Sequence, residues 1–317
     1  MDPLSDALSL MKLRTYKCGG LETGPEVSIA FPSLPGLKCY AVVKGRCWVA
    51  VEGLATPSRI EAGECFLLPT TRPFRIASDL ALPSVDSEEI FASGANGAIK
   101  TYRGGGEGFV LASHFALEGE QADLLLASLP PLVHVRKTSD QAALRWALDR
   151  MILELREPAP GDALVAEHLA HLILIHALRS HLAEAPEGQT GWLFALADRR
   201  MQAALGAMHG DPARRWTLSQ LAAHCGMSRS AFAARFRRRV GVAPLEHLAR
   251  WRISLAADRL ARSEERVSDI ALSLGYESAS AFSAAFRRFM SCSPRDYANR
   301  RTQRPDPQEG LPATIQA

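Results

Sequence analysis

Short apolar runs recur between about residues 25 and 115, each bounded by glycine or proline. The runs cover residues 38–43, 47–51, 65–68 and 109–111, and the bounding residues include Gly45, Gly53, Gly63 and Pro69. Strands of this length, closely spaced and separated by turn residues, are typical of antiparallel sandwiches and small barrels. The pattern therefore predicts an antiparallel β-sandwich in the first part of the chain.

The pattern changes to a helical period over residues 139–209. A Pro-Ala-Pro-Gly break at 158–161 separates a first helix from a second that runs to about Leu182, and a linker at 186–191 precedes a third. The second helix is amphipathic and does not have the pattern of a membrane span, because four histidines and Arg179 interrupt it. Its apolar seam either packs on the sandwich or pairs two copies of the chain, and we expect a homodimer. The seam consists of Leu164, Leu169, Leu172, Ile175 and Leu178.

Two stretches in the last third of the chain, residues 217–244 and 266–294, are near-copies of one another. The aligned pairs include Gly226 with Gly275, Ser228 with Ser278, Phe232 with Phe282, Phe236 with Phe286 and Pro244 with Pro294. An internal repeat of this kind indicates one structural unit built twice.

Each copy has the pattern of a helix-turn-helix. In the first copy Gly226 ends a short helix with an apolar face, and Ser228 can cap the next helix. The second copy repeats this arrangement around Gly275. Two short helices joined by such a turn form the motif that places its second helix in the DNA major groove. For either copy alone, a helical hairpin in an ordinary bundle is the alternative.

Between the copies, Pro244 can open a helix that continues to about Arg262. At ~1.5 Å per residue, its roughly 18 residues span about 27 Å. Successive major-groove faces on one side of a duplex lie ~34 Å apart. Such a helix can therefore hold two reading helices against adjacent grooves.

Positive charge is concentrated in the same part of the chain. Residues 210–301 contain 17 arginines, no lysine and 8 acidic residues, a net charge of +9, whereas the whole chain carries only +3. The remaining residues are therefore acidic on balance. A basic segment that carries a groove-binding motif is the electrostatic pattern expected for contact with DNA phosphates.

The segment from Trp216 to Arg301 resembles the AraC/XylS-type bacterial transcription regulators. The resemblance rests on the second copy, IALSLGYESASAFSAAFRRF, followed by Ser293, Pro294 and Tyr297. The N-terminal pattern VVKGRCWVAVEG…RIEAGECFLLPTTRPFRI resembles the cupin-type sensing domain of one branch of these regulators. The resemblance implies an α+β protein with a cupin-like N-terminal sandwich, a helical connector and an all-α double helix-turn-helix that reads DNA.

The resemblance also implies which positions face the bases. They are Ser230, Ala233 and Ala234 in the first copy, and Ala279, Ser280, Ser283 and Ala284 in the second. Because serine and alanine cannot form the bidentate contact to guanine, we expect specificity to depend on Arg229, Arg235 and DNA shape. The residues expected to hold phosphates are Arg237, Arg238, Arg287 and Arg288. Ser291 stands where the first copy has Gly241, a position that favours left-handed backbone, so strain is expected there.

The predicted sandwich lacks the ligands of a metal-dependent enzyme. Cupin enzymes bind metal through closely spaced histidines and carboxylates, and residues 28–110 contain no histidine. His168 and His171 have the helical spacing of a metal pair, although partly exposed histidines on an interface helix explain them more simply. We therefore expect no metal, no cofactor and no catalytic residue.

Six cysteines occur at positions 18, 39, 47, 65, 225 and 292, none of them in a Cys-x-x-Cys spacing. In the cytoplasm they are expected to be reduced, and most are expected to be buried. Cys18 lies in a polar segment, predicted to be a loop, beside Lys17. A lowered thiol pKa there would make Cys18 a candidate redox sensor, with Cys39 or Cys65 as its partner.

The sequence thus predicts a sensing domain (residues 1–135), a helical connector (136–209), a DNA-binding domain (210–301) and a disordered tail (302–317). The first residues lack the apolar run of a secretory signal, so we expect a cytoplasmic transcription regulator. Its expected partners are double-stranded promoter DNA, a small-molecule or oxidant effector, a second copy of the chain and RNA polymerase. A low-specificity architectural DNA-binding protein and, more remotely, a cupin-type metal-dependent enzyme remain as alternatives.

Overall fold

The computed structural model describes residues 2–69, 71–91, 98–136, 141–184, 189–263 and 265–301. These residues form two compact units. The sheet unit contains the described residues of 13–117 and 129–184, and the helical unit contains those of 1–12, 118–128 and 185–310. The tail predicted from residue 302 lies outside the described residues.

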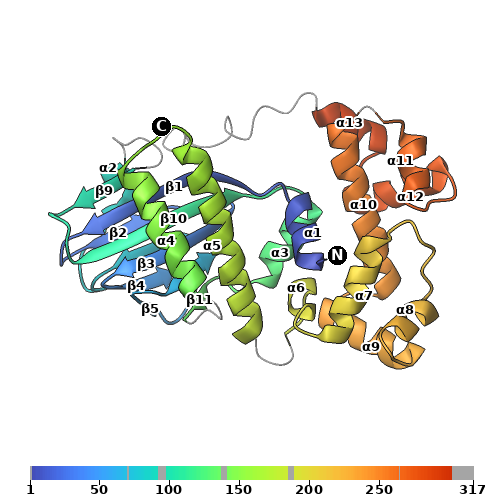
Figure 1. Ribbon diagram of the computed structural model, residues 1–317, viewed down its shortest axis with the longest axis horizontal. Coiled ribbons are helices and arrows are strands. Elements are labelled where there is room, and N and C mark those ends of the chain that lie inside the picture. The colour runs from blue at the N-terminus through green and yellow to red at the C-terminus, as the bar shows by residue number, and fades with distance from the viewer. Residues whose placement is uncertain are drawn as a thin grey trace. The chain divides into compact units, whose positions relative to one another are not determined.

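The sheet unit is a sandwich of two β-sheets (Figure 1). One sheet contains β1 (Arg14–Thr23), β3 (Leu37–Lys44), β6 (Cys65–Leu68), β9 (Ile99–Tyr102), β10 (Gly108–Ala116) and β11 (Val133–Val135). The other contains β2 (Ser28–Phe31), β4 (Arg46–Val51), β5 (Ser58–Glu61), β7 (Phe74–Ala77) and β8 (Val85–Asp86). The strand orders are β11-β6-β3-β10-β1-β9 and β5-β4-β7-β2-β8. Described strands pair antiparallel except β1 with β9 and β2 with β8, so the predicted antiparallel sandwich is confirmed.

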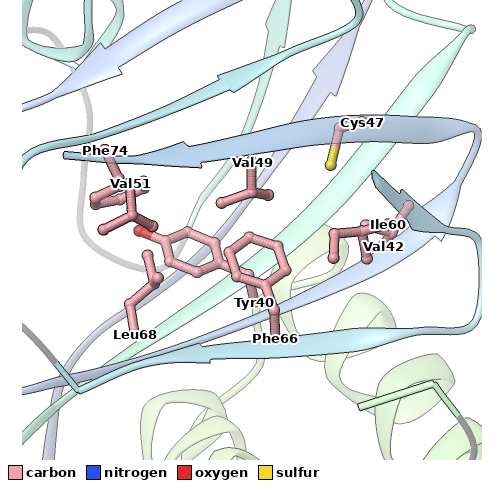
Figure 2. Packing of buried hydrophobic residues seen from close by; sticks show 9 residues of the cluster. All are labelled: Tyr40, Val42, Cys47, Val49, Val51, Ile60, Phe66, Leu68 and Phe74. Atoms are coloured by element: carbon pink, nitrogen blue, oxygen red, sulfur yellow. The ribbon is translucent and has the colours of Figure 1, made fainter. Parts of the chain in front are cut away.

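The apolar core of the sandwich lies between the two sheets, where Figure 2 shows side chains of both sheets pointing toward one another. Tyr40 and Phe66, from adjacent strands of the first sheet, stack with ring centroids 4.9 Å apart. Tyr40 also meets Phe74 of the opposite sheet edge-to-face at 5.7 Å. Such pairs add about 0.5–1.5 kcal/mol each to the burial of their surface. The rest of the drawn cluster is Val42, Cys47, Val49, Val51, Ile60 and Leu68.

Two helices, α4 (Gln141–Arg156) and α5 (Asp162–Glu184), lie across the outer face of the six-stranded sheet (Figure 1). The predicted apolar seam of α5 does not share one face. Leu169 and Leu178 are buried, whereas 60% of Leu164 is exposed. Part of the seam therefore packs within this unit and part faces outward. A third, short helix, α2 (Ser87–Phe91), follows β8.

The helical unit includes segments from the N-terminal half of the chain. Helix α1 (Pro3–Leu10) packs against α7 (Arg199–Gly210) and α10 (Pro244–Arg262), and α3 (Glu120–Ser128) packs against α6 (Trp192–Ala195). Leu4, Ala7 and Leu8 of α1 are buried, and Met11 beyond its end is fully buried. The sequence placed residues 1–135 in one sensing domain, whereas in the structure α1 and α3 cluster with the C-terminal helices. Long-range packing of these apolar side chains determines that grouping.

The remaining helices form the two predicted repeats. The first copy is α8 (Leu218–His224) and α9 (Arg229–Val240), and the second is α11 (Val267–Ser273) and α12 (Ala279–Met290), followed by α13 (Pro294–Arg301). Ser228 and Ser278 cap α9 and α12 by accepting hydrogen bonds from the backbone N–H groups of Ala231 and Ala281. Pro244 opens α10, as predicted. Ser291 ends α12 with a φ of +57°, which confirms the expected left-handed end.

Buried histidines join α7 to α10. Nε2 of His209 lies 3.1 Å from Nε2 of His247, and the His209 ring stacks on Trp251 with centroids 3.7 Å apart. Burial lowers the pKa of His209 to about 2 and that of His247 to about 4. Both imidazoles are therefore neutral parts of the core near neutral pH.

Candidate nucleic-acid interface and sandwich cavity

The reading helices α9 and α12 bury matching faces and expose the opposite ones. Phe232 and Phe236 of α9 are fully buried, as are Phe282 and Phe286 of α12. In each pair the two rings lie 5.6 Å apart. Spacing at i and i+4 puts both rings on one side of the helix, which leaves the predicted DNA-facing side uncovered.

Most of the predicted DNA-binding residues lie on those uncovered faces. The exposed ones are Arg229, Ser230, Ala234, Arg237 and Arg238 on α9, and Ala279, Ser280, Ala284, Arg287 and Arg288 on α12. Ala233 and Ser283, at equivalent positions, are half-buried. The Ser283 hydroxyl donates a hydrogen bond to the backbone oxygen of Ala279 at 2.7 Å. The structure therefore brings two small-residue surfaces, each followed by an arginine pair, to matching positions of the two copies.

Arg235 is placed differently from the other arginines of α9. Its Nε and one terminal nitrogen each lie 2.7 Å from Oδ2 of Asp198, the residue that caps α7. Burial raises the pKa of Asp198, but hydrogen bonds from Arg235 and the Arg200 backbone outweigh it and hold the pKa below its usual value. The equivalent residue of α12 is Ala285. The ion pair thus ties α9 to α7, and no local sequence signal connects residues 37 positions apart.

Residues 211–216, which precede α8, form a clamp against the second copy. Arg252 of α10 donates hydrogen bonds to the backbone oxygens of Pro212, at 2.6 Å, and Arg214, at 3.0 Å. Arg215 forms a surface ion pair with Glu277 at 3.1 Å. Gly275 packs so closely on this segment that a Cβ there would lie 2.1 Å from the backbone oxygen of Ala213. The 211–216 clamp therefore fixes the first copy against the turn of the second.

Helix α10 provides the frame between the two copies, as Figure 1 shows within this unit. Its 19 residues span about 28 Å at ~1.5 Å per residue. Ile253 and Leu260 of α10 pack in one cluster with the buried residues of the second copy, including Phe286, which meets Tyr297 of α13 edge-to-face. The spacing predicted from the sequence is thus built on a packed helix.

The sheet unit contains a cavity of about 290 Å³ between its two sheets. Apolar lining comes from Leu21, Val42 and Val110 on one sheet and from Ile29 and Ile76 on the other. Charged residues also line it: Lys17, Lys44, Arg46, Lys100 and Glu88. A cavity bounded by both sheets and partly open to solvent is a place where a small molecule can bind.

Three histidines of the sheet unit contact other side chains. Nε2 of His114 lies 3.0 Å from the Tyr40 hydroxyl, and burial lowers the pKa of His114 to about 3. His134 contacts Glu64 at 2.9 Å. His171 lies beside the Phe115 ring, 5.9 Å between centroids. Among the described residues, no three histidine, cysteine, aspartate or glutamate side chains are grouped so that they could hold a metal ion.

Cys18 lies inside strand β1 and not in a loop. Burial raises the pKa of its thiol to about 11, although a contact with the Ser113 hydroxyl partly opposes this. The expectation of a lowered pKa is therefore wrong. Ser113 of β10 separates Cys18 from Cys39 of β3, so their Cα atoms lie two strand spacings, roughly 10 Å, apart. Cys65 is one strand farther, and a disulfide needs less than about 7 Å.

Comparison with known proteins assigns both parts of the chain. Residues 2–183 match the family described as Cupin, and residues 221–300 match the Helix-turn-helix domain family. An AraC-like transcription regulator of Streptomyces antibioticus is 40% identical over 298 residues, which cover 94% of this chain and 98% of that protein. The HTH-type transcriptional regulator AlkR of Acinetobacter baylyi is 28% identical over 94% of this chain and 99% of its own.

Among solved structures, a transcriptional regulator from Chromobacterium violaceum with an AraC-type DNA-binding domain matches 35% of this chain and 99% of its own, at 22% identity and a TM-score of 0.33. No helix in the described part of the chain is long and apolar enough to cross a membrane. On the strength of the near-full-length matches, the chain belongs to the AraC-like transcription regulators that join an N-terminal cupin domain to a C-terminal helix-turn-helix domain.

Proposed function

We propose that this protein is a sequence-specific regulator whose helices α9 and α12 enter adjacent major grooves of promoter DNA, and whose sandwich cavity binds a small-molecule effector. The observation that carries the proposal is the pair of matching exposed faces held on one frame by α10 and the 211–216 clamp. A reader with a fixed spacing between its two helices selects sites whose two blocks lie about one helical turn apart.

The two reading helices have different capacities for base contact. Arg229, the first residue of α9, is exposed and can form a bidentate contact to guanine, whereas its counterpart Ala279 cannot. The short side chains on both helices allow close approach to thymine methyl groups and respond to groove shape. They are Ser230, Ala233, Ala234, Ala279, Ser280, Ser283 and Ala284. Arg235, held by Asp198, positions α9.

The exposed arginine pairs near the ends of α9 and α12 are proposed to hold phosphates. They are Arg237 and Arg238, and Arg287 and Arg288. Each phosphate contact contributes about 0.9 to the slope of log Kd against log salt. Arg287→Ala should therefore reduce that slope by about one, while Arg59→Ala, at an exposed arginine of β5 in the sheet unit, should leave it unchanged. Equal slopes for the Arg287→Ala variant and the parent protein would contradict the proposed phosphate contact.

A second copy of the chain is the partner proposed for the outer faces of α4 and α5. Large apolar side chains are exposed there: Trp146 by 60%, Leu153 by 48% and Leu164 by 60%. Burial of such a surface favours association, and two copies would double the number of reading helices on one promoter. Sedimentation of the full chain with Trp146→Ser should show a larger monomer fraction, and an unchanged dimer would contradict this assignment.

The proposed output is control of transcription by RNA polymerase. The proposal also places the chain in the cytoplasm, because its DNA partner lies in that compartment. It assigns catalysis to none of the chain's residues. The architectural alternative is tested by the same DNA experiment. A specific regulator binds its site ~10³-fold or more tightly than random DNA, whereas an architectural protein would show almost no ratio.

A further inference from the structure

Two small residues face each other across neighbouring strands of the six-stranded sheet in the wall of the cavity. Gly19 of β1 pairs with Ala112 of β10, and both line the cavity. Side chains alternate between the faces of a strand, so the neighbours of Gly19 on its inward face are Lys17 and Leu21, which line the cavity too. A Cβ at Gly19 would lie 3.1 Å from the backbone oxygen of Ala98, so this position favours glycine. A residue larger than Ala112 on the facing strand would fill part of the cavity.

The charged groups around this apolar space are mostly cationic. Lys17, Lys44, Arg46 and Lys100 line the cavity, and Glu88 is the one acid among the lining residues that the structure describes. Lys17 and Lys100 come from the adjacent parallel strands β1 and β9. Burial, together with the charge of Lys100, lowers the pKa of Lys17, and the Lys17 ammonium lies 5.6 Å from the centre of the Phe91 ring. An anion placed beside both ammonium groups would relieve their repulsion.

Two neutral polar groups of the cavity lining are occupied within the protein. The Tyr40 hydroxyl is paired with His114. The Ser78 hydroxyl accepts a hydrogen bond from the backbone N–H of Val27 and donates one to the backbone oxygen of Val27. Both groups keep these protein partners when an apolar chain packs over them, so such burial leaves neither of them unpaired.

The volume of the cavity sets the size of the ligand. A cavity of about 150 Å³ accommodates benzene, which has six non-hydrogen atoms. A space of about 290 Å³ therefore takes roughly twelve, the size of decanoate. We propose that the sandwich cavity binds an amphipathic monocarboxylate of this size, with its carboxylate beside Lys17 and Lys100 and its apolar chain over Leu21, Val42 and Val110.

This inference rests on the proposed function only where it takes the bound monocarboxylate to be the effector of the regulator. Binding of the monocarboxylate can be measured without DNA. The probe is decanoate, titrated calorimetrically into the full-length protein at neutral pH, with 1-decanol and decylammonium as neutral and cationic analogues of equal chain length. Decanoate should bind at least about tenfold more tightly than 1-decanol, because a carboxylate gains charge-assisted hydrogen bonds from lysine. Decylammonium should not bind.

Two kinds of variant locate the head and the tail of the ligand. Lys17→Gln should weaken decanoate about tenfold and leave the affinity for 1-decanol unchanged. Arg14→Gln, an exposed cation of the same strand outside the cavity lining, is the matched control and should change neither. Ala112→Phe should abolish binding of both ligands by filling the cavity. The milder Ala112→Val should weaken both equally, and circular dichroism would show whether each variant folds.

Equal affinity for decanoate and 1-decanol, unchanged decanoate binding in Lys17→Gln, or no binding of any of the three probes would each overturn the proposed ligand class. A change in DNA affinity on adding decanoate would support both the ligand class and the effector role. If decanoate binds with the expected charge dependence but alters neither DNA affinity nor transcription, the ligand class stands and the effector part of the proposed function fails.

Discussion

Replacing the equivalent turn glycines by alanine should affect the two helix-turn-helix copies unequally. Gly226 and Gly275 occupy the same position in the two turns, with φ of +62° and +80°. Alanine in left-handed backbone costs about 1 kcal/mol at either position. Around Gly226 nothing lies within 4 Å of the new Cβ, whereas at Gly275 it would lie 2.1 Å from the backbone oxygen of Ala213.

The clamp cannot easily move away from that Cβ, because Arg252 holds it through two hydrogen bonds. Overpacking of this kind costs a further 1–3 kcal/mol, so Gly275→Ala should cost roughly 2–4 kcal/mol in total. One kcal/mol changes an opening equilibrium about fivefold and two change it about thirtyfold.

Hydrogen exchange read by mass spectrometry measures both effects in the full-length protein. Gly226→Ala should speed exchange of the slowest amides in α8 and α9 about fivefold, and Gly275→Ala should speed those in α11 and α12 about thirtyfold or more. Equal effects, or a larger effect of Gly226→Ala, would refute the role assigned to the 211–216 clamp.

Three further predictions concern single side chains. Ser291→Gly should stabilise the second copy by about 0.5–1 kcal/mol, because glycine adopts left-handed backbone without the strain that serine has there. Amides of α11 and α12 should therefore exchange more slowly in the same measurement, and unchanged exchange rates would contradict the strain. The folded-state pKa values of His209 and His247, about 2 and about 4, lie below the ordinary 6.5, so only the unfolded chain takes up protons as the pH falls through 6.5. The free energy of unfolding should therefore be constant above about pH 7 and lower by about 1.4 kcal/mol per histidine at one pH unit below 6.5. In urea unfolding, the His247→Gln variant should lose less stability than the parent protein over this pH range. A parent protein whose stability does not fall would contradict the burial of these histidines. Raising the Cys18 pKa from 9.0 to about 11 lowers its thiolate fraction at neutral pH about a hundredfold, so iodoacetamide should modify it far more slowly than free cysteine, and an oxidant response lost in Cys18→Ser would contradict the structure.

Local features were predictable from the sequence because local chemistry determines them. Pro244 at the start of α10, Ser228 and Ser278 at the caps, and the left-handed Ser291 all follow from backbone preferences of single residues. The phenylalanine stripes followed from helical spacing.

Features that depend on distant segments were not predictable. The pair between Arg235 and Asp198 joins residues with no common motif. Helix α1 joins the helical unit through tertiary packing. The raised pKa of Cys18 depends on burial in a strand that its polar sequence concealed. The wall of the cavity includes Gly19 facing Ala112 across two strands, a pairing that only the register shows.

The central claim is that the two copies act together as one reader of specific DNA. Selection of bound sequences from a random duplex library by the full-length protein, under reducing conditions at physiological salt, tests it most directly. The account predicts a recurrent motif with two blocks about one helical turn apart, one of them containing the guanine contacted by Arg229. Salt-sensitive binding without enrichment of any sequence, with and without decanoate present, would contradict it.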